Sequence, residues 1–225
     1  MITQEGRTSS RLGREAERGL ENLLQQFDLW AASADQSDDG WESDFPQWPE
    51  LIRDAERAMA GEAQSEHVLS LIGRCWSLSH EDETCADWAR RQVQDVRVQE
   101  LVRRLADDDD ATTRWQACDV LGDQAVLDDV TRVALEKGMT DENAYVRRRA
   151  FLSLLRHREG DVQPYVLRML ADASSYNRYV GVKVVTNDSA TLLRDQAQAA
   201  AQDPDVASLL AHYISHKETI DRFDK

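Results

Sequence analysis

The chain has 225 residues and a formal net charge of −15 at pH 7, so its electrostatic field repels phosphate backbones and attracts cationic surfaces. Only 10 Gly and 4 Pro interrupt it, which favours helix over strand and argues for one sizeable domain or repeat array. The sequence shows neither a signal-peptide pattern nor an apolar run of ~20 residues, so we expect a cytoplasmic protein that binds no membrane and no nucleic acid.

Residues 1–47 are predicted to form an N-terminal helix followed by an acidic aromatic loop. From Leu20 to Phe27, apolar residues recur at i, i+3, i+4 and i+7, which is the spacing of one helix face. The following stretch, residues 27–51, holds three of the six tryptophans, seven acidic residues and no basic residue. A simple linker seldom contains so many aromatic side chains.

Two interpretations of residues 27–51 remain open. In the first, the aromatic rings fold back and cap the end of a helical array, because terminal repeats need a cap. In the second, some rings are exposed anchors inside an acidic rim that suits a basic partner. The candidate partner-binding residues in this stretch are Asp38, Asp39, Trp41, Glu42, Asp44 and Trp48.

Residues 48–96 are predicted to hold a helix pair that lacks the repeat signature described next. An apolar stripe runs from Val68 to Cys75 at helical spacing. The three cysteines, Cys75, Cys85 and Cys118, are odd in number and fit no CxxC spacing, which predicts reduced thiols. Cys75, His80 and Cys85 are evenly spaced but have no fourth ligand nearby, so we expect no metal there.

Residues 97–216 contain a repeated layout. "LADDDDATTRWQACDVLG", "MTDENAYVRRRAFLSLL" and "LADASSYNRYVGVKVV" each begin with a large apolar residue, and the three starting positions are 34 and 31 residues apart. An Asp follows two positions later, an Arg six or seven positions after it, and a small residue three positions beyond the Arg. The resulting Asp–Arg ladder consists of Asp107, Arg114, Asp141, Arg147, Asp172 and Arg178.

This layout resembles the HEAT-like repeat superfamily over about residues 97–187. The resemblance implies an all-α fold, a right-handed α-α superhelix (solenoid) of about four or five antiparallel helix pairs, and a structural role for the ladder. We expect one continuous domain, 1–225, with a further repeat helix at 203–216 and a tail at 217–225. Valine alternation at 176–185 also fits a strand, but the repeat register predicts a helix.

Few residues suggest catalysis or metal binding. The run Asp107–Asp110 lacks the alternation and the central glycine of an EF-hand, so it is predicted to be a turn. His212 and His216 lie four residues apart but lack the Glu of HExxH, which indicates a surface pair. No nucleophile, P-loop or dinucleotide motif is present, and we expect no cofactor and no metal.

The basic cluster "VRRRAFLSLLRHR" at 146–158 carries two further candidate partner-binding residues. Arg149 and Arg156 are seven apart and share a helical face. Because second helices line the concave side of HEAT-like arrays, these arginines are placed at the edge of a groove. The alternative is an ordinary charged surface on an acidic protein.

The function that the sequence favours is non-catalytic protein binding through an acidic surface. An adaptor, or an immunity-type protein that neutralises a basic toxin such as a nuclease, fits this charge and size. The enzymatic alternative is a DNA-repair enzyme, because some alkylpurine DNA glycosylases resemble HEAT-like arrays, and Trp115 and Asp119 are the nearest candidates for their base-binding residues. Bilin lyases also resemble such arrays, but no motif of theirs occurs here. The sequence leaves the oligomeric state open.

Overall fold

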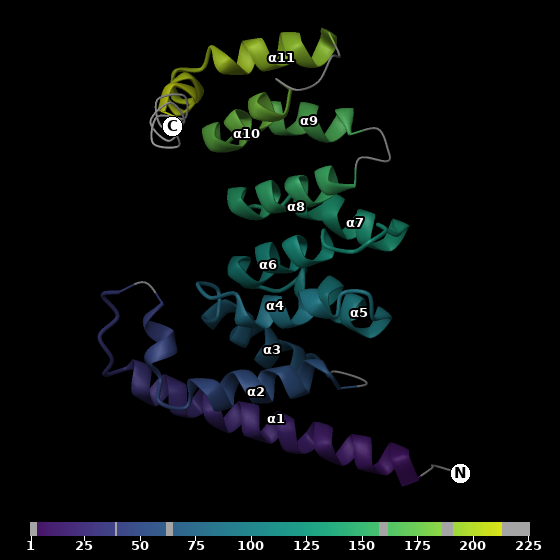
Figure 1. The fold of residues 1–225 in the computed structure, drawn as a ribbon. Coiled ribbons are helices and arrows are strands. Elements are labelled where there is room, and N and C mark those ends of the chain that lie inside the picture. Colours follow the sequence, from purple (N-terminus) through teal and green to yellow (C-terminus); the bar gives the residue numbers. More distant parts are fainter. Residues whose placement is uncertain (1–3, 39, 62–64, 158–161, 186–190, 213–225) are drawn as a thin grey trace, which may run out of the picture. The chain divides into compact units, whose positions relative to one another are not determined.

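The structure, a computed structural model, describes residues 4–38, 40–61, 65–157, 162–185 and 191–212 (Figure 1). Within these ranges every regular element is a helix and none is a strand, which confirms the predicted all-α class. The chain divides into two compact units, Met1–Arg156 and His157–Lys225. The boundary between them falls inside the range that the sequence assigned to repeats.

The first unit begins with a long helix that lies against the next two. Its described elements are α1 (Gln4–Ala31), η1 (Trp41–Asp44), α2 (Trp48–Met59), α3 (Glu66–Leu78), α4 (Thr84–Arg91), α5 (Val96–Leu105), α6 (Ala111–Leu121), α7 (Asp129–Gly138) and α8 (Ala144–Arg156). Leu20, Leu24 and Phe27 of α1 are buried, as their spacing predicts. They pack toward α2 and α3 and fix the position of the loop that follows α1.

Residues 48–96 hold three helices, which corrects the predicted pair. The additional element is α4, whose Cys85, Ala86 and Trp88 are buried. It has only eight residues and begins after Glu83, a non-glycine residue with a φ of 49°. A helix of two turns is too short to show a clear apolar period, so the sequence pattern missed it.

The polar breaks between stripes begin the next helix, as their composition predicts. The side chains of Ser65, Asp95, Asp110 and Asp128 each accept a hydrogen bond from a backbone N–H in the first turn of α3, α5, α6 and α7. One such cap typically contributes about 1 kcal/mol. The acidic run 107–110 is therefore the turn before α6, and Asp110 is its cap.

Helix α6 is the most enclosed element of the first unit. It contacts α3, α4, α5, α7 and α8, and its side chains from Gln116 to Leu121 are all buried. Two buried polar groups attach it to α3. The Thr113 hydroxyl donates to the carbonyl of Gly73 at 2.8 Å, and the Gln116 amide donates to the carbonyl of Trp76 at 2.9 Å. Any polar side chain on α6 therefore has to find its partners inside the protein.

The second unit contains α9 (Gln163–Leu170), α10 (Ser175–Val185), α11 (Thr191–Ala201) and a further helical stretch at 204–212. Helix α10 packs against α9 and α11, so the helix predicted at 176–185 is confirmed over the strand-like alternation. Gly181 allows this packing, because a Cβ there would lie 3.1 Å from the backbone nitrogen of Leu170. The helix predicted at 203–216 is described as far as residue 212, and the rest, with the tail 217–225, lies outside the described residues.

Candidate functional site

An arginine at the start of three helices binds the turn that precedes it. In each case the Nη1 group donates to the carbonyl oxygens six and five residues earlier, at 2.7–3.0 Å. The sets are Arg114 with Asp108 and Asp109, Arg147 with Asp141 and Glu142, and Arg178 with Asp172 and Ala173. The equivalent aspartate of the first set is thus Asp108, which corrects the predicted Asp107 by one residue. Asp107 is exposed, and its carboxylate pairs with Lys137 at 2.6 Å.

In Arg114 and Arg178, the remaining nitrogens reach forward to the next turn. Arg114 donates from Nε and Nη2 to both oxygens of Asp141, at 2.7 and 3.0 Å, and the two side chains are only 10% and 12% exposed. Arg178 donates to Asp203 at 2.7 Å. Burial alone would raise the pKa of Asp141, but the guanidinium of Arg114 and the N–H of Asn143 lower it below its ordinary value. The ladder therefore links one turn to the next.

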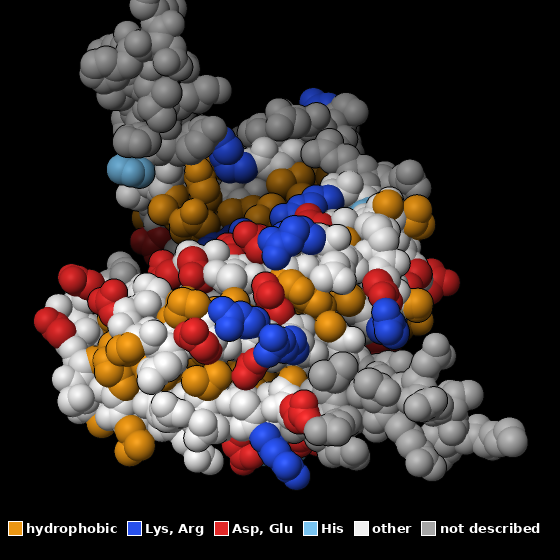
Figure 2. All heavy atoms as spheres, turned by 60° about the horizontal axis from the view of Figure 1, so that its bottom comes forward, with side chains coloured by type: hydrophobic (Ala, Val, Ile, Leu, Met, Phe, Trp, Pro, Cys, Tyr) orange, Lys and Arg blue, Asp and Glu red, His pale blue; other side chains and the backbone are white. Residues whose placement is uncertain are grey.

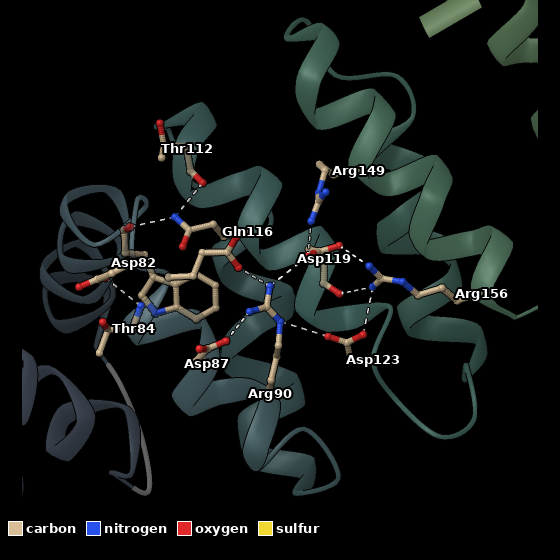
Figure 3. Close-up of polar contacts among 12 residues, drawn as sticks. Asp82, Thr84, Asp87, Arg90, Thr112, Gln116, Asp119, Asp123, Arg149 and Arg156 are labelled. Carbon is tan, nitrogen blue, oxygen red and sulfur yellow. Dashed lines mark hydrogen bonds and ion pairs between the residues drawn. The ribbon is translucent and has the colours of Figure 1, made fainter. Parts of the chain in front are cut away.

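The strongest concentration of charge surrounds Asp119 on α6 (Figure 3). Its side chain is 5% exposed and accepts from three arginines: Arg90 of α4 at 3.0 Å, Arg156 of α8 at 2.7 Å, and Arg149 of α8. Asp123, one turn further on, accepts from Arg90 at 3.2 Å and from Arg156 at 3.1 Å. We call these five residues the Asp119 network. It joins α4, α6 and α8.

The Asp119 network is poorly suited to proton transfer. Burial would raise the pKa of Asp119, but Arg149 and Arg156 lower it below its ordinary value. Both carboxylate oxygens already accept charged donors, so the group stays ionised and is a weak base toward a substrate. Its chemistry is that of a buried ion-pair joint.

Trp115 lies beside this network on the same helix. Its ring meets Tyr145 of α8 edge to face at 5.1 Å, and the guanidinium of Arg149 lies 5.5 Å from its centroid. The structure therefore brings together the sequence's Trp115 and Asp119, and it also brings Arg149 and Arg156 to them. These two arginines are ion-paired to Asp119 rather than free at the edge of a groove. Sequence reasoning missed Arg90, because α4 was not predicted, and it missed Asp123.

A second group of interest is the aromatic loop after α1. Trp41 of η1 stacks on Trp30 at 5.6 Å with an interplanar angle of 21°, and it also contacts Phe27 at 5.8 Å. Phe45 is buried, whereas Trp30 and Trp41 remain partly exposed. Trp48 is only 9% exposed, so its ring is a core group of α2 and not the surface anchor that the sequence suggested.

The acids around this loop differ from those at Asp119. Among the described residues of this stretch, Asp38, Glu42 and Asp44 form no ion pair with any cation that the structure describes. Asp39 lies outside the described residues. We call Trp30, Trp41, Asp38, Glu42 and Asp44 the loop patch. It combines half-buried indole rings with unpaired negative charge.

In the described part of the chain, the cysteine thiols and histidines form no cluster like the Asp119 network or the loop patch. Burial raises the pKa of Cys85 and Cys118 to about 12 and raises that of Cys75, so these thiols are poor nucleophiles. His80 contacts the carbonyl of Ser77 at 2.9 Å. No three His, Cys, Asp or Glu side chains in the described part of the chain are placed to hold a metal ion. His216, the second half of the predicted histidine pair, is outside that part.

Comparison with protein-family models, with curated proteins and with solved structures finds no match for this chain. In the ranges that the structure describes, no helix has the length and apolar character needed to span a bilayer.

Proposed function

We propose that this protein is a non-catalytic scaffold of HEAT-like helical repeats, and that its loop patch binds a partner protein with a basic surface. The unpaired acids of the loop patch carry this proposal. The enclosed carboxylates of Asp119 and Asp141 are matched by arginines. Asp38, Glu42 and Asp44 instead lie in the loop that carries the partly exposed Trp41, and they pair with no cation among the described residues. A lysine or arginine of a partner would supply the missing charge and stack on the rings.

The recurring turn supports the repeat part of the proposal. Asp108, Asp141, Asp172 and Asp203 are 33, 31 and 31 residues apart, and each accepts a backbone N–H two residues later. Antiparallel pairs would then be α2/α3, α5/α6, α7/α8, α9/α10 and α11 with 204–212. We propose that the pairs within each unit stack as HEAT-like repeats, and that α1 caps the first unit. In this scheme α4 is an insertion between the first two pairs.

The negative net charge of this protein favours a basic partner. A scaffold of net charge −15 attracts a basic protein over a distance, and the attraction weakens as salt is added. An adaptor that docks basic proteins and an immunity-type protein that neutralises a basic nuclease would both use this surface. In both roles the acids mainly speed association, and the indole rings contribute most of the contact energy.

The proposal is tested by neutralising the patch. The triple variant Asp38→Asn, Glu42→Gln, Asp44→Asn and the control variant Asp109→Asn, Asp195→Asn, Asp205→Asn have the same net charge. Each tagged protein is used to capture partners from a lysate at low salt, and the captured proteins are identified. We expect a basic protein to be lost with the first variant and kept with the control. Equal capture by both variants would remove the loop patch from the proposal.

One observation favours a second candidate, a DNA-repair enzyme that resembles the alkylpurine DNA glycosylases. Trp115, Asp119 and Arg149 are gathered on neighbouring turns of α6 and α8. Against this candidate, both oxygens of the Asp119 carboxylate already accept from arginines. On the face drawn in Figure 2, basic side chains also lie beside acidic ones rather than forming a continuous area. Release of a methylated base from DNA by the wild type, abolished in Asp119→Asn, would establish the enzyme and overturn the scaffold proposal.

A further inference from the structure

Helix α7 and the loop before it expose three aliphatic side chains. Val130 and Val133 of α7 are 62% and 63% exposed, and Val126, three residues before the helix begins, is 76% exposed. Single apolar residues on a surface need no explanation, but a contiguous group indicates a contact site. Valine is also a poor residue for an exposed helix position, because its branched side chain loses rotamer freedom there. These valines therefore weaken α7 unless they pack against something.

Charges on either side of the valines show which partner fits. Val130 and Val133 are three residues apart and so lie on one face of α7. Asp129 stands exposed in the first turn of this helix and Lys137 stands exposed in its last turn. When two copies of α7 meet antiparallel, the Asp129 of each copy lies opposite the Lys137 of the other. The face is thus complementary to itself.

Within the chain, Lys137 contacts Asp107 at 2.6 Å, with side chains 66% and 56% exposed. An ion pair as exposed as this one contributes about 0–1 kcal/mol and is readily exchanged for another acid. Lys137 is therefore available to the Asp129 of a second copy. A two-fold contact is also the commonest arrangement in homo-oligomers.

We propose that a second copy of this chain docks on α7, so that the protein self-associates through a two-fold antiparallel contact of Val126, Val130 and Val133 flanked by Asp129 and Lys137. Three valines cover only part of the ~800 Å² per partner of a stable interface, so the dimer is weak, with a Kd on the order of 10–100 μM. The proposal does not depend on the loop patch.

Salt separates this contact from the binding of a basic partner. Two chains that each carry −15 repel one another, and added salt screens this repulsion. The apolar contact of the valines persists in salt. Self-association through α7 therefore strengthens as salt rises, whereas binding of a basic protein to the loop patch weakens.

The test is sedimentation velocity on the full chain, over protein concentrations from about 1 to 500 μM, which bracket the expected Kd. The wild type should move from the 25.6 kDa monomer toward twice that mass. Val130→Glu with Val133→Glu should weaken association at least tenfold. Val96→Glu with Leu29→Glu is the matched control, because it adds the same two charges at exposed aliphatic residues (61% and 78%) on other helices, and it should associate like the wild type. A wild type that stays monomeric throughout, or equal association of all three proteins, would overturn the proposal.

The antiparallel orientation is tested by exchanging charges. Asp129→Lys alone should weaken association, because it places two lysines opposite one another. Asp129→Lys combined with Lys137→Asp should restore it. Circular dichroism on each variant shows whether α7 and the rest of the chain still fold. Restoration supports the antiparallel contact, and equal weakening of folded single and double variants contradicts it.

Discussion

The Asp119 network and the loop patch use similar residues in opposite ways. Both place carboxylates near tryptophan rings in the first unit, Trp115 beside the network and Trp41 in the loop patch. In the network, Asp119 is enclosed and three arginines neutralise it and its neighbour Asp123. In the loop patch, Asp38, Glu42 and Asp44 pair with no cation in the described ranges, and two indole rings keep part of their surface in water. Acidic residues that pair with arginines of the same chain hold helices together, while acidic residues without such a pair are available to a partner protein.

The largest expected effect is the removal of the central carboxylate of the network. Asp119→Ala leaves Arg90, Arg149 and Arg156 facing one another in a poorly hydrated site. Removing one partner of a buried ion pair typically costs about 3–5 kcal/mol. Urea unfolding should show a loss in this range, and Asp123→Ala, at a more exposed carboxylate, should lose far less. A loss of less than about 1 kcal/mol would mean that the network contributes nothing beyond a surface pair.

The next largest loss of stability should come from breaking the Asp–Arg ladder. Arg114→Ala removes two hydrogen bonds to Asp141 and two to the preceding turn. Hydrogen bonds to charged groups contribute about 1.5–3 kcal/mol, so we expect a loss of that size in the free energy of unfolding. Arg97→Ala, at an arginine whose pair with Asp95 is exposed, should change stability by only about 0–1 kcal/mol. Similar losses in both variants would show that the ladder is no stronger than a surface pair.

Acid should weaken the same interactions. The pKa values of Asp119 and Asp141 are lowered in the folded state. Their contribution is therefore complete above the unfolded pKa of ~3.9 and is lost as pH falls through the folded pKa. The free energy of unfolding should be steady between about pH 7 and pH 5 and should fall below about pH 4. In Asp141→Asn the fall should be shallower, and an unchanged slope would contradict the assignment.

In the loop patch, Trp41→Ala should lower the free energy of unfolding by an intermediate amount. A fully buried tryptophan costs about 3–5 kcal/mol when truncated, whereas this ring is partly exposed and packs on Phe27 and Trp30. We expect the free energy of unfolding to fall by about 1–2 kcal/mol in thermal or urea unfolding, because part of the ring already contacts water in the folded protein. A loss in the fully buried range would favour the cap interpretation alone, and no loss would favour the anchor interpretation alone.

The smallest effect should come from neutralising the loop acids. Asp38→Asn, Glu42→Gln and Asp44→Asn break no ion pair within the described part of the chain, so stability should stay within about ±0.5 kcal/mol. Thermal unfolding of this triple variant checks the point before any binding experiment is interpreted. A larger loss would place the acids in the fold and not at a binding surface.

The predictable part of this molecule is its helices and their boundaries. Apolar spacing located most of the buried residues of α1 and all of those of α5, but in α3 it found Ile72 and Cys75 and missed Leu69 and Trp76. The polar breaks contained the capping residues of the next helices. The ladder was misplaced at Asp107 because four consecutive aspartates offer four registers, and only the hydrogen bonds of Arg114 select Asp108. Local patterns also gave no sign of Arg90, which lies 29 residues from Asp119 on a helix too short to show a period.

Residues that the sequence pattern placed in one group differ in their environment in the structure. Trp41 and Trp48 look alike in an acidic stretch, yet η1 leaves the first partly exposed while α2 places the second in the core. Arg149 and Arg156 looked like free cations on one helical face, and the position of Asp119 on the neighbouring helix decides otherwise. Such outcomes depend on contacts between helices, which no single stripe contains.

Amide hydrogen exchange tests directly whether the unpaired acids of the loop patch mark the binding surface. Exchange is measured by mass spectrometry on the protein alone and on its complex with the basic protein captured from the lysate. We expect slower exchange in the complex across residues 33–38 and 40–47, with no change in α6 and α8 around the Asp119 network. Protection confined to α6 and α8, with the loop exchanging as fast as in the free protein, would contradict it.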